Sequence, residues 1–242
     1  MAEPEEILDF INGFLRDRHY RPLAGLTALV TAGPTYERLD PVRYIGNFST
    51  GKMGIALAQV LARKGARVKL VLGPTTQQVF EPGVDVIRVE SAHEMYESCL
   101  KVFPEAAISI LAAAVADYTP ETRSTEKIKK QGDALQIQLK KTEDILATLG
   151  AQKRTDQLVV GFALETHQEQ QHALEKLERK NADLIVLNSL RDEGAGFGHD
   201  TNKVTLVQRN GTLQELPLQS KQEAAAAIVN FILEMRHVEK TV

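Results

Sequence analysis

The sequence predicts a doubly wound α/β fold, in which helices cover both faces of a mainly parallel sheet. Three observations support this prediction. Strand-like and helix-like segments alternate from residue 26 almost to the end of the chain. The first and central strand segments are apolar throughout, as is typical of parallel strands buried on both faces. The length of 242 residues is sufficient for a sizeable core in one large or two small domains.

The expected strands are short apolar or β-branched runs that lie between turn residues and helix-like stretches. They are expected, in order, at residues 26–32, 68–72, 84–89, 108–114, 135–139, 158–164 and 184–188. The stretches between them predict helices at residues 51–64, 92–103, 142–152, 168–180 and 220–235. Near the end, Asn210-Gly211 separates apolar runs at 204–208 and 213–216, which predicts a tight hairpin turn.

The region between residues 29 and 56 carries the most functional information. An apolar run ends at Gly33-Pro34-Thr35, a polar loop follows, and Ser49-Thr50-Gly51-Lys52 then leads into a helical pattern. The N–H groups in the first turn of a helix carry partial positive charge and bind anions. Asp40, Arg43 and Asn47 add polar groups that a simple phosphate loop does not need. A site for a phosphate and a group attached to it is favoured over a purely structural loop.

The common nucleotide-binding fingerprints do not match this region. A Walker A sequence requires Ser or Thr after its lysine to hold Mg²⁺, whereas Met53 follows Lys52. The dinucleotide pattern G-x-G-x-x-G does not follow the first strand segment. Its absence argues against an NAD(P)-dependent oxidoreductase, which stays an alternative together with a non-enzymatic nucleotide-binding module.

A second candidate site lies where an alanine-rich strand segment ends in Asp117. Ligands of open α/β sheets bind beyond the carboxyl ends of the strands, and small side chains there let a flat ring come close. The Asp117 carboxylate could accept hydrogen bonds from ribose hydroxyls or help to hold Mg²⁺. The structural alternative is a helix N-cap or a turn aspartate.

Two groups of lysines could neutralise a polyphosphate. The first is Glu126-Lys127-Ile128-Lys129-Lys130, where a solvated face is the alternative. The surrounding segment, residues 118–131, has no apolar period, so little is expected to anchor it without a ligand. The second group is Lys176 and Lys180, four residues apart on one helix face, where a mixed exposed face is the alternative.

Composition excludes several classes of function. The net charge of −3 gives no bulk attraction to nucleic acid or to an anionic membrane, so neither is expected as a partner. There is no apolar run of membrane-spanning length and no signal peptide, which indicates a cytoplasmic protein. Cys99, the single cysteine, is expected to be a half-buried core residue. The sequence contains no cluster of Cys and His residues with the spacing of metal ligands, so no metal site of that kind is predicted.

The N-terminal segment differs from the rest of the chain. Residues 5–16 carry an apolar stripe at helical spacing, and Arg18-His19-Tyr20-Arg21-Pro22 then breaks the pattern. The segment could be a helix on the flank of the domain or a connector to another domain. We therefore divide the chain into a connector-like helix and linker, residues 1–24, and a nucleotide-binding domain, residues 25–242.

Four motifs resemble those of bacterial phosphopantothenate–cysteine ligases, which use CTP in coenzyme A synthesis. They are TAGPTYERLDPVRYIGNFSTGKMG, LAAAVADYTP with EKIKKQ, VGFALET, and KLERKNADLIVLN, and they occur in the family's order between residues 31 and 188. The resemblance implies a Rossmann-like sheet with added β elements for dimerisation, hence a homodimer. It also implies a fused or associated flavin-dependent phosphopantothenoylcysteine decarboxylase, to which residues 2–8 would connect.

The resemblance implies a two-step reaction. The carboxylate of 4′-phosphopantothenate attacks the α-phosphorus of CTP, which gives an acyl-cytidylate and pyrophosphate. The amine of cysteine then attacks the acyl carbon and releases CMP. Mg²⁺ is the expected cofactor, and no covalent protein nucleophile is required.

The resemblance also implies roles for particular residues. Asn47 would bind the acyl-cytidylate, and Lys127 would meet the triphosphate from a flexible loop; these two are the expected catalytic residues. The expected nucleotide-binding residues are Ser49, Ala113, Asp117, Lys127, Glu143, Asp144, Ile145, Leu146, Phe162, Lys176 and Lys180. Two positions depart from the family pattern: Thr142 and Glu143 replace Asn-Pro before Asp144, and Phe48 replaces histidine.

Overall fold

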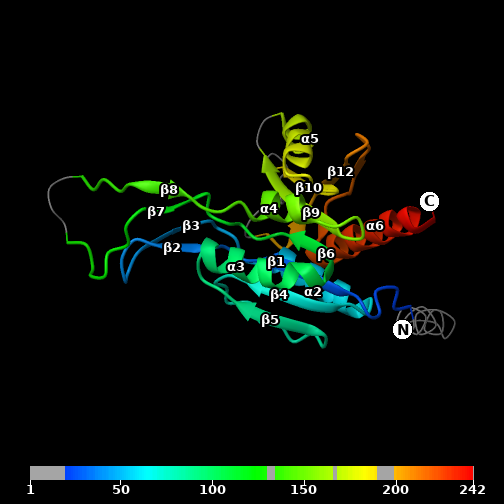
Figure 1. Ribbon diagram of the computed structural model, residues 1–242, viewed down its shortest axis with the longest axis horizontal. Helices are drawn as coiled ribbons and strands as arrows, with labels where there is room; N and C mark the ends of the chain where they lie inside the picture. Colours follow the sequence, from blue (N-terminus) through cyan, green and yellow to red (C-terminus); the bar gives the residue numbers. More distant parts are fainter. Residues whose placement is uncertain (1–19, 130–133, 166–167, 190–198, 242) are drawn as a thin grey trace, which may run out of the picture.

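An eight-stranded sheet forms the centre of the computed structural model, which describes residues 20–129, 134–165, 168–189 and 199–241 (Figure 1). Its strand order is β13-β12-β10-β9-β6-β1-β4-β5. The strands are β1 (Thr27–Ala32), β4 (Arg67–Leu72), β5 (Val84–Arg88), β6 (Ala106–Leu111), β9 (Leu158–Glu165), β10 (Leu184–Ser189), β12 (Val204–Gln208) and β13 (Leu213–Glu215).

The six strands from β5 to β10 are parallel, and the chain starts this sheet in the middle, at β1. It continues to β4 and β5 on one side and then returns to β6, β9 and β10 on the other. This is the strand order of dinucleotide-binding sheets, and it reverses between β1 and β6. β12 and β13 are antiparallel and meet at the expected Asn210-Gly211 turn, where Gly211 has a φ of 84°.

Helices cover both faces of the sheet, which confirms the doubly wound fold. One face packs against α2 (Lys52–Arg63) and α6 (Lys221–Thr241), and the other against α3 (Ala92–Val102), α4 (Ile145–Gln152) and α5 (Glu169–Arg179). Successive residues of a strand point to opposite faces, so Val30 of β1 joins the first core and Leu29 joins the second. All six residues of β1 are therefore buried, as its apolar composition predicts.

Cys99 is more deeply buried than expected. It lies on α3 within the second core, and its exposed fraction is 0% rather than that of a half-buried residue. Burial raises the pKa of the Cys99 thiol to about 12, so the thiol stays protonated at neutral pH. This position rules out a role as an exposed nucleophile.

Two short antiparallel pairs form an arm that extends away from the sheet (Figure 1). The family resemblance implies such added β elements, but the strand pattern of the sequence did not predict their positions. The first pair is β2 (Tyr36–Arg38) with β3 (Tyr44–Gly46), inside the segment expected to be a polar loop. The second is β7 (Tyr118–Pro120) with β8 (Leu139–Lys141), and β7 lies beside β2. We use "the arm" for residues 36–46, 118–129 and 134–141.

The expected strand at residues 135–139 is wrong, because only Leu139 belongs to a strand and that strand lies in the arm. A third short pair, β11 (Thr201–Asn202) with β14 (Gln219–Ser220), lies next to α6. The helix expected within residues 5–16 falls outside the described residues. Within the part of the chain that the structure describes, no helix is both long and apolar enough to cross a bilayer.

Candidate functional site

A cavity of about 1090 Å³ lies at the carboxyl ends of β1, β6, β9 and β10. The first turns of α2 and α4 and the inner side of α5 complete its walls. Ligands of open α/β sheets bind at this edge, beside the point where the strand order reverses. We call this cavity the pocket. Of the expected site residues, every one except Lys127 lines it.

The loop that enters α2 brings backbone groups close together at the floor of the pocket. Gly33 and Gly51 have φ values of 83° and 79°, a backbone conformation that residues with a side chain rarely adopt. A Cβ atom on Gly54 would lie 2.5 Å from the Cβ atom of Ala32, so α2 packs directly on the end of β1. The Ser49 hydroxyl accepts a hydrogen bond from the Gly51 N–H at 3.3 Å. This arrangement suits a phosphate group at the start of α2.

Asn47 joins the two sides of the pocket. Its side-chain nitrogen donates to the backbone carbonyl oxygens of Ala114 and Val115, each at 3.1 Å. The family resemblance implies that Asn47 binds the acyl-cytidylate; in this structure its amide holds the alanine-rich segment after β6. Asn47 therefore links the loop before α2 to the segment that carries Ala113.

The alanine-rich segment is pinned to the end of β1 by threonine hydroxyls. The N–H of Ala113 donates to Thr31 Oγ1 at 3.1 Å, and the N–H of Ala116 donates to Thr35 Oγ1 at 3.0 Å. Asp117 follows, exposed at the rim of the pocket. It is not a helix N-cap, because β7 begins at the next residue, but its carbonyl oxygen accepts from the Thr142 N–H at 3.0 Å.

The residues before and within the first turn of α4 form one wall of the pocket. Asp144 is the N-cap of α4, and its carboxylate accepts from the Ala147 N–H at 2.9 Å and pairs with Lys180. Burial acts to raise the pKa of Asp144, but hydrogen bonds from Lys180 and Ala147 outweigh it and lower the pKa. Ile145 and Leu146 are buried and contribute apolar surface and backbone groups.

Glu143, which replaces a proline of the family pattern, projects to the surface. Its carboxylate lies 2.9 Å from His93 Nδ1. The pKa of Glu143 is lowered by a hydrogen bond from its own backbone N–H and by the contact with His93. The start of α4 is thus formed without the proline, and Glu143 gains a side-chain partner that the sequence did not predict.

Lys176 on α5 and Lys180, the residue that follows α5, are both held by partners that line the pocket. Lys176 Nζ donates to the backbone carbonyl oxygen of Phe162 at 2.9 Å, and Lys180 pairs with Asp144. The side chain of Lys180 is only 15% exposed, which argues against a solvated surface face. Phe162, on β9, also lines the pocket, and its half-buried side chain packs against the first core, on the face of the sheet that α2 and α6 cover.

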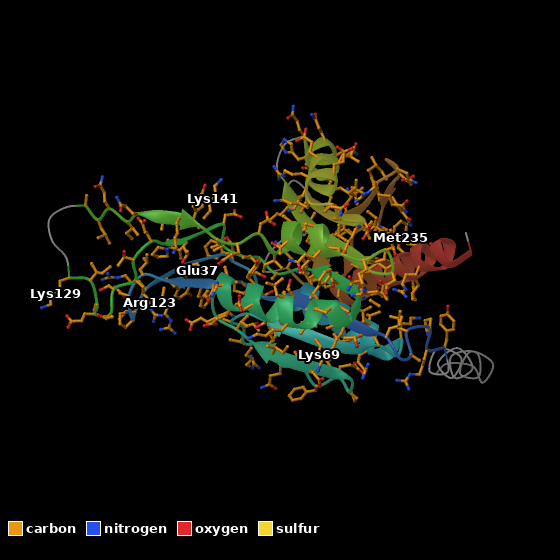
Figure 2. All side chains as sticks on the ribbon, in the orientation of Figure 1. Glu37, Lys69, Arg123, Lys129, Lys141 and Met235 are labelled. Atoms are coloured by element: carbon orange, nitrogen blue, oxygen red, sulfur yellow. The ribbon has the colours of Figure 1, made fainter. Side chains whose placement is uncertain are left out.

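Lys127 lies on the arm, outside the pocket of its own chain. Figure 2 shows the neighbouring Lys129 at the far end of the arm, well away from α5. The β7–β8 pair carries this segment outward. The expectation that little anchors the segment is wrong for residues 124–128, since the Ser124 N–H bonds to Leu39 O at 2.9 Å and the Ile128 N–H bonds to Asp40 at 3.1 Å.

Several pocket residues were missed by the sequence analysis. Lys52 pairs with Asp200, and the buried Lys221 donates to the His199 carbonyl oxygen. The pKa of Lys221 is lowered by burial and by Lys52, and raised in part by Asp200. Three buried side-chain oxygens among the described residues have no hydrogen-bond partner, and two of them belong to pocket residues, Asn188 and Asn202. Of these residues, Asn188 had a sequence signal, because it lies near the end of a predicted strand.

The balance of charge in the pocket favours an anionic ligand. Six basic side chains line it against four acidic ones: Lys52, Lys141, Lys176, Arg179, Lys180 and Lys221 against Asp117, Glu143, Asp144 and Glu175. Within the described ranges, no group of three or more His, Cys, Asp or Glu side chains is placed to hold a metal ion. The pocket could therefore hold a polyphosphate through helix N–H groups and lysines.

The fold and the pocket define an α/β protein whose pocket lies at the switch point of a Rossmann-type sheet. More particularly, the chain belongs to the family described as DNA/pantothenate metabolism flavoprotein C-terminal domain, whose model matches residues 23–235. This family confirms the resemblance seen in the sequence.

Similar proteins support the same assignment. The chain is 43% identical over 232 residues to the coenzyme A biosynthesis bifunctional protein CoaBC of Bacillus subtilis (strain 168). The match covers 96% of this chain but 57% of that relative. It is 49% identical over 239 residues to a "Cysteine/Cysteine sulfinic acid decarboxylase" from an unknown prokaryotic organism, spanning 98% of itself and 67% of that protein. The crystal structure of the C-terminal domain of a CoaBC protein is 41% identical, with a TM-score of 0.75 and coverage of 89% of this chain and 97% of that one.

Proposed function

We propose that this chain is the ligase domain that joins 4′-phosphopantothenate to cysteine in coenzyme A biosynthesis, with CTP as the activating nucleotide. The observation that carries the proposal is the pocket at the β1–β6 switch point. It gathers all but one of the residues that the ligase motifs identify, and its basic side chains outnumber its acidic ones. The similarity to CoaBC proteins supports the same substrate class.

The parts of the pocket suit the parts of these substrates. The first turn of α2 with Ser49 would hold phosphate, and the backbone around Ala113 together with Phe162 would hold the cytosine ring. Asp117 would accept from the nucleotide's polar groups, while Lys176 and Lys180 would neutralise its charge. The start of α4, residues 143–146, would close the nucleotide side of the pocket.

The proposed chemistry proceeds in two steps. The carboxylate of 4′-phosphopantothenate attacks the α-phosphorus of CTP, so that a C–O–P bond forms and pyrophosphate leaves. The cysteine amine then attacks the acyl carbon of the acyl-cytidylate, an amide forms and CMP leaves. Both steps require charge neutralisation and alignment rather than a protein nucleophile. The buried and protonated Cys99 is consistent with this.

Mg²⁺ is part of the proposal as an ion carried by the triphosphate. Mg²⁺ is commonly bound by one or two carboxylates together with substrate phosphates and water. Asp117 supplies such a carboxylate at the rim of the pocket. When bound, the ion would neutralise charge on the phosphates.

We further propose that the working form is a homodimer joined through the arms. The arm exposes several large apolar side chains: Val42, Tyr44, Tyr118, Leu135, Ile137 and Leu139. Phe48, two residues beyond the arm, is exposed as well. Such a surface calls for a partner. A second copy is favoured because Lys127 lies outside the pocket of its own chain, so an arm that reaches the partner's pocket would complete the site.

The cellular context follows from the same proposal. A flavin-dependent phosphopantothenoylcysteine decarboxylase, fused or associated, would use the product of this domain. A cytoplasmic location would give access to CTP and cysteine.

A pyrophosphate-release assay tests the proposed function. With phosphopantothenate and CTP alone, the protein should release about one pyrophosphate per site, because the acyl-cytidylate stays bound. Adding cysteine should give continuous turnover, with CMP and phosphopantothenoylcysteine identified by mass spectrometry. The same assay with ATP measures the base preference.

Other outcomes would identify other functions. Tight CTP binding without pyrophosphate release would indicate a nucleotide-binding module without ligase activity. Oxidation or reduction of NAD(P), followed by absorbance, would indicate an oxidoreductase. Release of CO₂ from cysteine by this chain alone would contradict the ligase assignment.

A further inference from the structure

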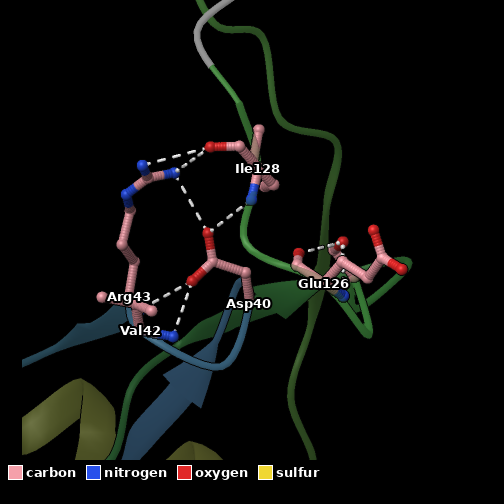
Figure 3. Close-up of polar contacts among 6 residues, drawn as sticks. Asp40, Val42, Arg43, Glu126 and Ile128 are labelled. Carbon is pink, nitrogen blue, oxygen red and sulfur yellow. Dashed lines mark hydrogen bonds and ion pairs between the residues drawn. The ribbon is translucent and has the colours of Figure 1, made fainter.

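A buried carboxylate lies inside the arm, next to the segment that carries Lys127. Asp40 is in the turn between β2 and β3, and its exposed fraction is 0% although the arm is thin. Oδ1 accepts from the backbone N–H groups of Val42 and Arg43, at 2.7 and 2.8 Å. Oδ2 accepts from Arg43 Nη1 at 3.0 Å and from the backbone N–H of Ile128 at 3.1 Å (Figure 3).

Arg43 completes this contact from the other side of the peptide. Its Nη1 and Nη2 atoms both donate to the carbonyl oxygen of Ile128, each at 3.2 Å. Both backbone polar groups of Ile128 are therefore bound by side chains of a turn that lies 85 or more residues earlier in the chain. We call the set of Asp40, Arg43 and Ile128 the latch.

The backbone of the Lys127 segment is held on one side by the latch and on the other side by a second set of hydrogen bonds. The Ser124 N–H bonds to the Leu39 carbonyl oxygen at 2.9 Å, and the Ser124 hydroxyl donates to the Glu126 carbonyl oxygen at 2.6 Å. Lys127 is the residue between Glu126 and Ile128. Its backbone is thus held to the β2–β3 turn, while its side chain stays exposed.

The bond to Ile128 exceeds what the turn itself needs. The two N–H groups of Val42 and Arg43 are sufficient to close a turn at an aspartate. Burying an ionised carboxylate costs free energy unless several hydrogen-bond donors compensate for the lost water. Burial acts to raise the pKa of Asp40, but hydrogen bonds from Val42, Ile128 and Arg43 outweigh it and lower the pKa. Asp40 is therefore ionised at neutral pH and available to hold a distant segment.

We propose that Asp40 is a positioning residue for Lys127. It holds Lys127 at the position along the arm from which the lysine meets the triphosphate. The inference rests on the proposed ligase function and deepens it. Asp40 touches no substrate, and it acts through the backbone of Ile128. The latch makes the β2–β3 turn and the Lys127 segment a single unit.

The test measures both half-reactions in Asp40→Asn. Asparagine keeps the size of the side chain but offers an NH₂ group to the backbone N–H donors. We expect pyrophosphate formation to fall about 10- to 100-fold, the effect of a misplaced catalytic group, with little change in cysteine's attack on supplied acyl-cytidylate. The double variant Asp40→Asn/Lys127→Gln should be no slower than Lys127→Gln alone. Asp85→Asn, on β5 outside the arm, is the matched control.

A purely structural role gives a different result. Equal losses in both half-reactions, or multiplied losses in the double variant, would overturn the proposal. Amide hydrogen exchange gives a readout that does not depend on activity: the Ile128 amide should exchange more slowly in the wild-type protein than in a free peptide of residues 121–129. Equal rates would refute the latch even if Asp40→Asn does not fold. Absence of pyrophosphate release by the wild-type protein would refute the ligase function but leave the exchange result to decide the latch.

Discussion

Asn47 is the residue on which the two halves of the pocket depend. Its amide nitrogen donates to the carbonyl oxygens of Ala114 and Val115, so a carboxylate in its place would face two oxygens without a hydrogen to share. We expect Asn47→Asp to raise the barrier to ligation by about 2–4 kcal/mol, the range for a lost oxyanion-type donor. The fold should persist because the side chain is exposed in a loop.

Measurement of kcat and KM for each half-reaction, with a thermal melt, would check this prediction. Asn210→Asp is the matched control, since Asn210 lies in the hairpin turn and its side-chain oxygen accepts from the Thr212 N–H, which aspartate can also do. Wild-type activity in Asn47→Asp would remove Asn47 from the site.

Lys127 gives a prediction that separates the two chemical steps. A lysine is a point charge on a long stem, suited to follow a triphosphate as pyrophosphate departs. We expect Lys127→Gln to slow formation of the acyl-cytidylate severely, and to affect cysteine's attack on supplied acyl-cytidylate much less. Rapid-quench measurement of each step would show this, with Lys101→Gln on α3 as the control for loss of one positive charge. Equal losses in both steps would show that Lys127 acts on something other than the triphosphate.

Asp144 gives a prediction about pH. Its folded-state pKa is lowered, so its stabilising effect is complete above the unfolded-state pKa and is lost as the pH falls through the folded-state pKa. We expect Asp144→Ala to reduce the free energy of unfolding by about 0.5–2 kcal/mol at pH 7, as for a lost N-cap. The difference from wild type should shrink below about pH 4. Urea unfolding at several pH values would measure it, with Asp85→Ala as control; a pH-independent difference would contradict the prediction.

At the scale of elements, the arm is fixed at its base as well as at the latch. The Glu37 carboxylate accepts from the Ala92 N–H at 2.8 Å, at the start of α3, and Arg38 pairs with Glu90. Tyr36 and Tyr44 stack across the hairpin with ring centroids 3.8 Å apart. The arm therefore projects as a rigid element, which is a property that an interface between subunits requires.

The dimer prediction belongs to this scale. We expect a concentration-dependent dimer in sedimentation velocity, because the arm's exposed apolar side chains would be covered by a second copy. Leu135→Glu, which charges an arm residue that is 57% exposed, should weaken the dimer and lower ligase activity in parallel. Phe80→Glu, at an exposed position outside the arm, is the matched control. A wild-type monomer at every concentration would refute the prediction.

The central strands and all of the described helices were predictable, whereas the arm was not. β1, β4, β9 and β10 are mainly apolar or β-branched stretches of six to eight residues, long enough for their pattern to identify them. The arm strands β2, β3, β7 and β8 have three residues each, too few to show an alternation. β7 and β8 also pair across residues 121–138, a connection too long to be read as a tight hairpin from the sequence.

At the scale of the whole molecule, the sequence could predict which residues line the pocket better than it could predict the contacts that they make. Ala113 lies near the end of a predicted strand, at the edge of the sheet where ligands bind, whereas Phe162 was implied by the family resemblance. The bonds from Asn47 to Ala114 and from Ile128 to Asp40 join segments 67 and 88 residues apart, and no local pattern encodes them. Nor does a local pattern show that the arm carries Lys127 away from the pocket.

Three lysines around the pocket already have partners within the protein. Binding of an anion at the pocket would therefore exchange one partner of each lysine for another. Lys180 is paired with Asp144, Lys52 with Asp200, and Lys176 with the Phe162 carbonyl oxygen. In the proposed reaction, a nucleotide would have to displace these resident partners when it binds, so part of its attraction would be offset. The same groups would recapture the lysines when pyrophosphate leaves. The protein would thereby hold its cations in place between turnovers and avoid trapping the most highly charged product.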